Sequence, residues 1–566
     1  MGFCETVLIN ALFFSSLATF AKADWQFHSR PDLSPPKLNV TISSSKDLSP
    51  GYLFIAPYSG YFDNKIRYPR QPGPYIFTDE GELVWSGFGY ISIWAANFQA
   101  GKINGEDVLF SFEGSHNPNY GHGHGHVTVL NSNYETVKEI RAANHKVADK
   151  HEFHIIDEKT GLIEIYQPVP RDLKEFGANP EQRWIIDSII QEIDLETGNL
   201  LFEWSSLDHI SPAESVLPIT EGQAGYGYNS SDAWDYFHIN SVDKDEEGSY
   251  LISSRDTSSI YKINGSTGDI IWKLGGIPKK TSTSFKSSNF NFSFQHHARY
   301  LSTSSDRKSQ IISFYDNEAH GTEHKDGSEV HYGNHSSGKI IEVNTSSWEA
   351  KLLKQYNPPD DLLSKSQGST QVLPNGNVLV NWGSSGAVTE FKSDGTPIFH
   401  AYLDSNKLDG NIQNYRAFKY NWTGNPKEEI ALVWEGIDST KSVAYVSWNG
   451  DTRTAYWRFS LLSTEDDKKI LKNEIRTVQK SGFETSVEYN SDNIGKDKQI
   501  IVEALDKDGR LIITSRPVTL IPQVIQYDTE EKNLAGVFDS HGSGFQTYFS
   551  WRVAKETYDD KLSNRG

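Results

Sequence analysis

The segment INGSTGDIIW at 263–272 decides the fold of this chain of 566 residues. It places an apolar residue before a polar turn that contains Gly, and then an apolar run that ends in Trp272. Such a turn between two apolar runs is typical of a β-hairpin. The same phrase recurs, with variation, at 77–85, 130–140, 193–204, 343–353 and 391–400. This recurrence predicts a repeat architecture built from strands.

A second apolar–polar alternation around a turn precedes most copies of the phrase, as at 239–255 and 372–382. Two hairpins per unit make four strands. Units spaced at roughly 45–80 residues match propeller blades better than a solenoid. We therefore predict an all-β chain with a six-bladed β-propeller at 49–424. After the repeats, apolar and polar residues alternate more regularly, which predicts a small antiparallel β-sandwich at 425–522.

The two ends of the chain differ from this body. Residues 1–23 hold a short apolar stretch that ends in Ala21-Lys22-Ala23, which predicts a cleaved signal peptide and therefore secretion. Residues 24–48 form an N-terminal extension, and residues 523–566 read as a polar tail. No later segment approaches the length of a membrane span.

Composition excludes several classes of function. The net charge is −20 and there is no basic cluster, which argues against a nucleic-acid partner. The only cysteine, Cys4, lies in the predicted signal peptide, so the mature chain has no disulfide, no cysteine nucleophile and no Cys-based zinc site. Sequons that permit glycosylation occur at Asn39, Asn229, Asn264, Asn291, Asn334, Asn344 and Asn421.

Histidines begin three successive predicted blades. In a propeller the first strand of each blade lines the central channel, so equivalent repeat positions converge there. His151, His238 and His296 occupy such positions, and Arg255 follows on the next strand of its blade. A lone histidine at a strand start is usually a satisfied hydrogen-bonding residue. Three that converge beside an arginine indicate a site for an anionic substrate, with neutral imidazole as a nucleophile.

The run His122-Gly-His124-Gly-His126 admits a metal interpretation. In a strand its three side chains share one face, but successive ones lie about 7 Å apart, too far to bind one ion unaided. The alternating glycines more simply indicate close backbone packing. We therefore expect no metal at this run, and a supporting position facing the channel.

Several phrases together resemble the arylsulfate sulfotransferase family, in its secreted fungal branch. The phrases are GHGHGHVTVLNSNYETVKEI (121–140), HEFHI (151–155), QEIDLETGNLLFEWSSLDH (191–209), WDYFHINSVDKDEEGSYLISSR (234–255), FSFQHHAR (292–299) and SQGSTQVLPNGNVLVNWG (366–383). The resemblance implies a nucleotide-independent transfer of a sulfuryl group from an aryl sulfate to a phenolic acceptor, through a sulfated histidine. It implies no cofactor, and it leaves the oligomeric state open.

The resemblance also assigns roles to residues. It places the nucleophile on His296, next to Gln295, and the sulfate-binding histidines on His151 and His238. It places a sulfate-binding amide on Asn240 and the guanidinium on Arg255. We also expect Gln295 to contact the substrate, together with a hydroxyl from the last blade, which the resemblance places on Ser369 or Thr370.

Two other functions compete with this interpretation. A non-catalytic secreted propeller that binds a glycan or an anionic ligand would use the same histidines only as contacts. A sialidase-like or sulfate-ester hydrolase shares the hairpin STGDIIW at 266–272, but a sialidase needs three arginines and a Tyr–Glu pair that the predicted blade starts do not supply.

Overall fold

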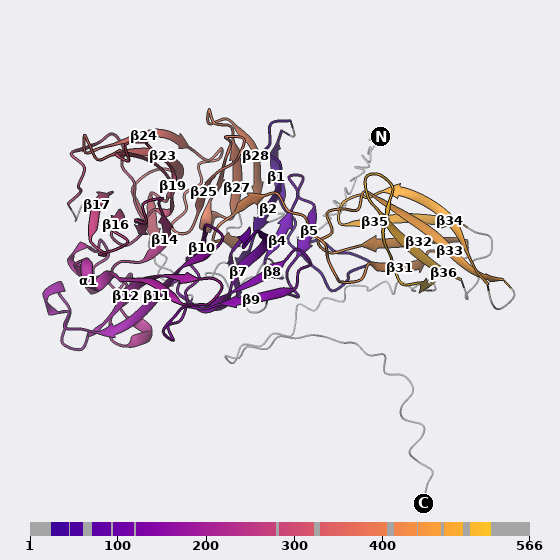
Figure 1. Cartoon of the computed structure of the whole chain (residues 1–566), viewed down its shortest axis with the longest axis horizontal. Helices are drawn as coiled ribbons and strands as arrows, with labels where there is room; N and C mark the ends of the chain where they lie inside the picture. Colours follow the sequence, from indigo (N-terminus) through magenta and orange to yellow (C-terminus); the bar gives the residue numbers. More distant parts are fainter. Residues whose placement is uncertain are drawn as a thin grey trace, which may run out of the picture. The chain divides into compact units, whose positions relative to one another are not determined.

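The structure, a computed structural model, describes residues 24–44, 46–59, 69, 71–91, 94–117, 120–278, 282–321, 329–403, 412–438, 440–465, 469–490 and 498–521. The predicted signal peptide and the polar tail lie outside these residues. The described chain is all-β (Figure 1). It has one short α-helix, α1 (Ser206–His209), and 3-10 turns at Lys174–Phe176, Pro212–Glu214, Ile219–Glu221, Ser230–Asp232 and Gly383–Ser385. No helix among the described residues is long and apolar enough to cross a membrane.

Six antiparallel sheets of at least four strands follow one another along the chain. The first three are β30 (Phe418–Tyr420)–β2 (Tyr52–Ile55)–β4 (Tyr75–Phe77)–β5 (Leu83–Ser86), β6 (Trp94–Ile103)–β7 (Glu106–His116)–β8 (Gly123–Asn131)–β9 (Thr136–Ile140), and β10 (Phe153–Ile156)–β11 (Thr160–Pro170)–β12 (Trp184–Asp194)–β13 (Leu200–Ser205). The next three are β14 (Ile239–Lys244)–β15 (Tyr250–Ser254)–β16 (Ser259–Ile263)–β17 (Ile270–Gly275), β19 (His296–Thr303)–β20 (Ser309–Asp316)–β23 (Ser337–Asn344)–β24 (Glu349–Tyr356), and β25 (Ser369–Val372)–β26 (Val378–Asn381)–β27 (Ala387–Phe391)–β28 (Pro397–Tyr402).

Short strands extend or connect these sheets. Within the predicted N-terminal extension, β1 (Asn39–Ser43) adds a fifth strand to the sixth sheet by pairing with β28. The dipeptide strand β18 (Ser287–Ser288) pairs in parallel with β24. Two small ribbons complete this part: β3 (Pro57–Ser59) with β29 (Ile412–Asn414), and β21 (Ala319–Gly321) with β22 (Glu329–His331).

The repeated hairpin phrase forms the last two strands of each sheet. In 263–272, the Oδ1 of Asn264 accepts the backbone N–H groups of Ser266 and Thr267 at 2.8 and 3.0 Å, which closes the turn. Gly268 then adopts a φ of +78°, a left-handed conformation that glycine enters without strain. Asp194 closes the same kind of turn in the third sheet. The polar residues of the phrase thus fix the turn locally.

A hydrophobic core lies between each sheet and the next. Leu251 and Trp272 of the fourth sheet, for example, pack with Ile312 and Phe314 of the fifth. Equivalent cores join the other neighbours, and one of them contains residues of both the first and the sixth sheet. These six sheets and their shared cores are consistent with a propeller.

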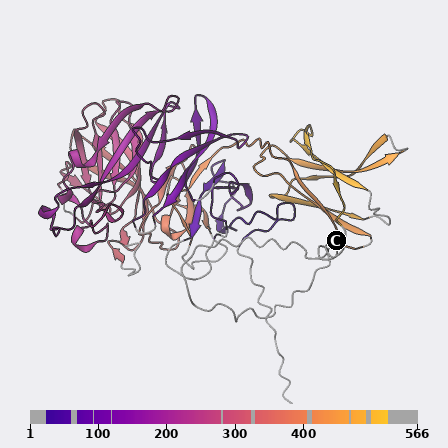
Figure 2. The ribbon, with the colours of Figure 1, turned by 90° about the horizontal axis from the view of Figure 1, so that it is seen from below.

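Residues after 430 form two further sheets that share one core (Figure 2). One consists of β31 (Ala431–Gly436), β32 (Lys441–Ser447) and β35 (Glu484–Asn490). The other consists of β34 (Lys469–Gln479), β33 (Tyr456–Glu465), β36 (Gln499–Leu505), β37 (Leu511–Thr514) and β38 (Val518–Thr519). Trp434 of the first sheet and Trp457 of the second are fully buried in this core.

Candidate active site

The predicted site residues lie where strands begin. His151 precedes β10, His238 precedes β14, and His296 is the first residue of β19. The backbone is unusual here, because His238, Phe294 and Gln367 have φ values of +51°, +53° and +67°. Non-glycine residues rarely adopt this conformation, and such strain tends to concentrate at functional sites.

One small cavity of about 50 Å³ brings four of the predicted residues together. His151, His238, His296 and Arg255 all line it. Its wall also includes Lys150, Asp235, Asp256, Gln367 and Tyr415. The rings of His151 and His238 are nearly perpendicular, with centroids 4.8 Å apart. The three histidines of successive sheets therefore face one space beside a guanidinium.

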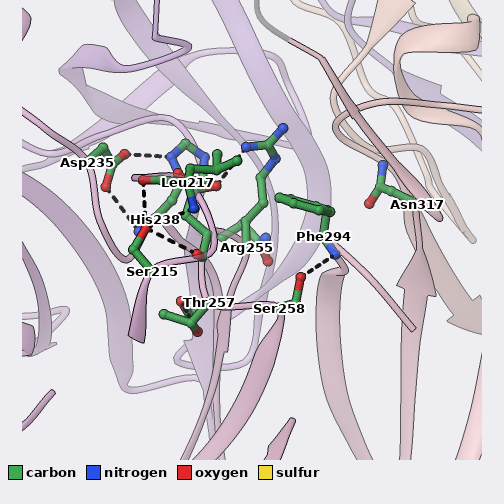
Figure 3. Close-up of polar contacts among 12 residues, drawn as sticks. Ser215, Leu217, Asp235, His238, Arg255, Thr257, Ser258, Phe294 and Asn317 are labelled. Atoms are coloured by element: carbon green, nitrogen blue, oxygen red, sulfur yellow. Dashed lines mark hydrogen bonds and ion pairs between the residues drawn. The ribbon is translucent and has the colours of Figure 1, made fainter. Parts of the chain in front are cut away.

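Each of the three imidazoles presents Nδ1 to an oxygen acceptor. Nδ1 of His238 lies 2.6 Å from Oδ2 of Asp235 (Figure 3), and Nδ1 of His151 hydrogen-bonds Oδ1 of Asp149. Nδ1 of His296 lies 2.7 Å from Oδ1 of Asn317. In the neutral form of each ring, these acceptors place the proton on Nδ1 and leave the lone pair on Nε2.

The environment keeps His296 neutral. The backbone N–H of Gln367 donates to Nε2 of His296 across 3.2 Å, which agrees with a lone pair on that atom. Burial, and next the positive charge of Arg255, hold the pKa of His296 well below its usual range. Burial and the charge of Lys150 lower the pKa of His151 in the same way. At neutral pH both rings are therefore uncharged.

Arg255 provides hydrogen-bond donors beside the cavity. Its side chain is 11% exposed, and one terminal nitrogen pairs with Oδ1 of Asp256 at 2.7 Å. The guanidinium lies 5.3 Å from the ring centre of Phe294. Figure 3 shows the two side chains next to each other. Its buried Nε makes no hydrogen bond. A buried donor of this kind is costly unless a ligand accepts from it, which favours an anion at this position.

The other four predicted residues support the strands around the cavity without lining it. Nδ2 of Asn240 donates to the carbonyl of Gln295 at 2.6 Å. Gln295 in turn donates to main-chain carbonyls of the fourth sheet. The hydroxyls of Ser369 and Thr370 donate to the carbonyls of Ala417 and Phe314. In this structure these polar groups connect neighbouring sheets.

The histidine run contributes a single residue to this region. His122 is buried, and its Nε2 lies 2.8 Å from the same Asp235 oxygen that contacts His238. His124 is exposed. A Cβ placed on Gly125 would lie 2.1 Å from the carbonyl oxygen of Glu113, so the backbones here pack too closely for a side chain.

Sequence reasoning assigned no role to several residues of this site. Asp149 and Asp235 precede the histidines they contact by two and three positions, and this short spacing was the available signal. Lys150 was also adjacent to a predicted residue, and its Nζ lies 3.4 Å from Nε2 of His151. Asn317 and Tyr415 are distant in sequence from every predicted histidine and gave no signal.

Comparison with known proteins identifies one family. No curated protein matches it. Among solved structures it is similar to a protein of unknown function from Bacteroides caccae, with 10% identity, a TM-score of 0.35, and coverage of 65% of this chain and 99% of that chain. It is also similar to the tricorn protease, with 11% identity, a TM-score of 0.17, and coverage of 82% of this chain and 43% of that chain. The family model described as arylsulfotransferase (ASST) matches residues 99–404, which is more than half of the sequence and includes His151, His238, Arg255 and His296. The chain belongs to the arylsulfotransferase family.

Proposed function

We propose that this protein transfers a sulfuryl group from an aryl sulfate ester to a phenolic acceptor through a sulfated His296. The observation that carries the proposal is the state of His296: a neutral ring, held at Nδ1 by Asn317, with its Nε2 lone pair beside a cavity that Arg255 also lines. A fixed tautomer and a lowered pKa are what a histidine nucleophile requires.

The reaction divides into two displacements. In the first, the lone pair of Nε2 on His296 attacks sulfur, the bond from sulfur to the aryl oxygen breaks, and a phenolate leaves with the electron pair. In the second, the oxygen of the acceptor phenol attacks sulfur, the S–N bond breaks, and Nε2 regains its lone pair. The acceptor proton passes to solvent or to the departed phenolate, so no nucleotide or redox partner is consumed.

The surrounding donors suit the charge that develops on the sulfuryl oxygens. The unpaired Nε of Arg255 lies at the cavity wall. The backbone N–H of Gln367 donates to Nε2 of His296, and it is released to the sulfuryl oxygens when that lone pair attacks sulfur. Positioned donors stabilise such charge strongly because they need no reorganisation. The side-chain Oδ1 of Asn317 accepts from Nδ1 of His296 and so stabilises the positive charge that the ring gains on sulfation. His151, His238 and Lys150 complete the wall.

A closed six-bladed propeller would hold these parts in place. Pairing of β30, near the end of the repeat region, with β2 near its start supports such closure. The buried guanidinium of Arg416 supports it as well, because it reaches Glu152 of the third sheet at 2.9 Å and the carbonyl of Asn240. In this proposal the cavity is the mouth of the central channel.

Intact-protein mass spectrometry tests the chemistry directly. The protein is mixed with an aryl sulfate without acceptor and quenched without acid. We expect a mass increase of one sulfuryl group on wild type and none on His296→Ala, with loss of the increment when a phenol is added. His335→Ala is the matched control, because that histidine does not line the cavity.

Other outcomes of this experiment identify the competing functions. Continuous release of phenol from the aryl sulfate in the absence of acceptor, with no sulfated protein, would indicate a sulfate-ester hydrolase. Neither phenol release nor modification, in the presence of tight anion binding, would indicate a non-catalytic binding protein. Either result would overturn the transferase proposal.

We also propose that the protein is secreted and glycosylated, as in the fungal branch it resembles. The asparagines of the seven sequons are all at least partly exposed, so a glycan is sterically possible at each. Export would give a mature N-terminus at Asp24, which sequencing of protein from the culture medium tests. A mobility shift after enzymatic removal of N-glycans tests the modification.

A further inference from the structure

A second cluster of ligating groups lies behind His151. Asp149 precedes β10 by four residues, and Glu164 projects from the neighbouring strand β11. Asp149, His151 and Glu164 are 3%, 3% and 1% exposed. One ligand atom from each lies within 4.8 Å of the other two. Neither carboxylate lines the cavity of the candidate active site, whereas His151 does.

The carboxylate of Glu164 is the unusual member of this cluster. Neither of its oxygens takes part in a hydrogen bond, although the side chain is fully buried. A buried carboxylate without donors is strongly unfavourable unless a proton or a cation neutralises it. Burial, and next the charge of Asp149, raise the pKa of Glu164 well above its usual range, although Arg416 and the hydroxyl of Tyr166 oppose this rise.

The distance between Glu164 and His151 suits two ligands of one metal ion better than it suits a hydrogen bond. Oε1 of Glu164 lies 3.5 Å from Nδ1 of His151, which is too long for a hydrogen bond. Two ligands about 2.1 Å from a tetrahedral zinc ion are separated by about 3.4 Å. Oδ1 of Asp149 hydrogen-bonds the same Nδ1, so an ion bound there would replace the shared proton and separate the two atoms.

We propose that Asp149, His151 and Glu164 bind one divalent transition-metal ion, with Zn²⁺ as the best match to one imidazole and two carboxylates. The two carboxylates are hard oxygen ligands, which disfavour soft metal ions. The imidazole is a nitrogen ligand, which magnesium and calcium rarely use. The ion would satisfy both orphan oxygens of Glu164. It differs from the histidine run at 122–126, where no metal is expected.

An ion at this site would change the hydrogen-bonding role of His151 in the cavity, a consequence that rests on the proposed function. With the ion on Nδ1, the proton of neutral His151 moves to Nε2, so the ring becomes a hydrogen-bond donor towards the sulfuryl oxygens. Without the ion, Nδ1 keeps the proton and Nε2 can only accept. Metal binding itself is measured without substrate, so its failure and the failure of the transferase proposal are distinguishable.

Metal content of the full chain tests the site. The protein is dialysed against Zn²⁺, freed of loose ion by gel filtration, and analysed by inductively coupled plasma mass spectrometry. We expect close to one Zn²⁺ per wild-type chain, and at least a tenfold lower occupancy in Glu164→Gln and in Asp149→Asn. Glu139→Gln, which removes an exposed carboxylate on β9, should retain the ion.

Two further measurements keep the result interpretable. Zn²⁺ should raise the Tm of wild type but not of Glu164→Gln, and circular dichroism shows whether that variant is folded. His122→Ala should keep the ion, because His122, Asp235 and His238 form a separate triad. Wild type without bound Zn²⁺ would overturn the proposal and leave a proton as the neutralising group. Loss of the ion in His122→Ala but not in Glu164→Gln would overturn it in favour of the other triad.

Discussion

Oδ1 of Asn317 lies 2.7 Å from Nδ1 of His296, although 21 residues separate the two in the chain. The carbonyl of Phe294 approaches the same nitrogen at 3.0 Å. Asn317 is itself held, because its Nδ2 donates to the carbonyls of Ser364 and Gln367 at the start of the sixth sheet. The orientation of the proposed nucleophile therefore depends on contacts between two neighbouring sheets.

Substitution of Asn317 should weaken the nucleophile without removing it. Asn317→Ala leaves Nδ1 of His296 with one acceptor and frees the ring to change tautomer, so we expect sulfation of His296 to slow by about 10–100-fold. Asn357→Ala, at an exposed position that follows β24 of the same sheet, serves as control and should leave the rate unchanged. Stopped-flow measurement of phenol release in the first turnover checks this. An unchanged rate in Asn317→Ala would contradict a positioning role.

The pH dependence of sulfation should reflect the lowered pKa of His296. The neutral ring is the reactive form, so a folded-state pKa below the usual value moves the acid limb of the rate to below about pH 6.5. The charge of Arg255 contributes to this lowering. Arg255→Gln should therefore shift the acid limb upwards, whereas Arg255→Lys keeps the charge and should keep its position. Single-turnover rates at a series of pH values show where the acid limb of the rate lies in wild type, Arg255→Gln and Arg255→Lys.

A buried arginine should contribute much of the stability of the repeat region. Arg416 is fully buried and pairs with Glu152, which also accepts from Arg299 at 2.7 Å. Arg416→Met leaves part of that buried charge uncompensated, so we expect a loss of about 3–5 kcal/mol in the free energy of unfolding. Arg141→Met breaks an exposed pair with Glu139 and should have little effect. Urea denaturation followed by tryptophan fluorescence compares the two.

The glycines between the histidines of the run at 122–126 should prove structural. Gly125 pairs with Gly114 across β7 and β8, and a Cβ on it would lie 2.1 Å from a carbonyl oxygen. Gly125→Ala should therefore destabilise the protein by about 1–3 kcal/mol. Gly89→Ala has open space around the new methyl group and should be tolerated. Equal Tm values for the two variants would show that the close approach of β7 and β8 is not needed.

The hairpins could be predicted from sequence because their causes are local. The polar turn at 263–272 contains both the side chain that caps it, Asn264, and the glycine that reverses it, Gly268. The same holds for the copy closed by Asp194. The strand β1 escaped prediction, because its pairing with β28 depends on a partner more than 300 residues away.

The candidate site also has some features that follow from the sequence and others that depend on packing. His151, His238 and His296 were predictable because repeat position alone brings strand starts towards one another, and the structure places all three on one cavity. Asn240 and Gln295 share those strand starts, yet their side chains turn to neighbouring carbonyls, a choice that depends on packing between sheets.

The sequence by itself therefore determined the strand repeats, their turns and the histidines at the strand starts, since each of these follows from the repeated pattern of nearby residues. Only the tertiary structure decided which nitrogen of His296 carries the proton, because its partner Asn317 lies 21 residues away in the chain. It alone also revealed the orphan carboxylate of Glu164, because burial and the absence of donors are properties of a packed interior, in which distant segments exclude water from the same point.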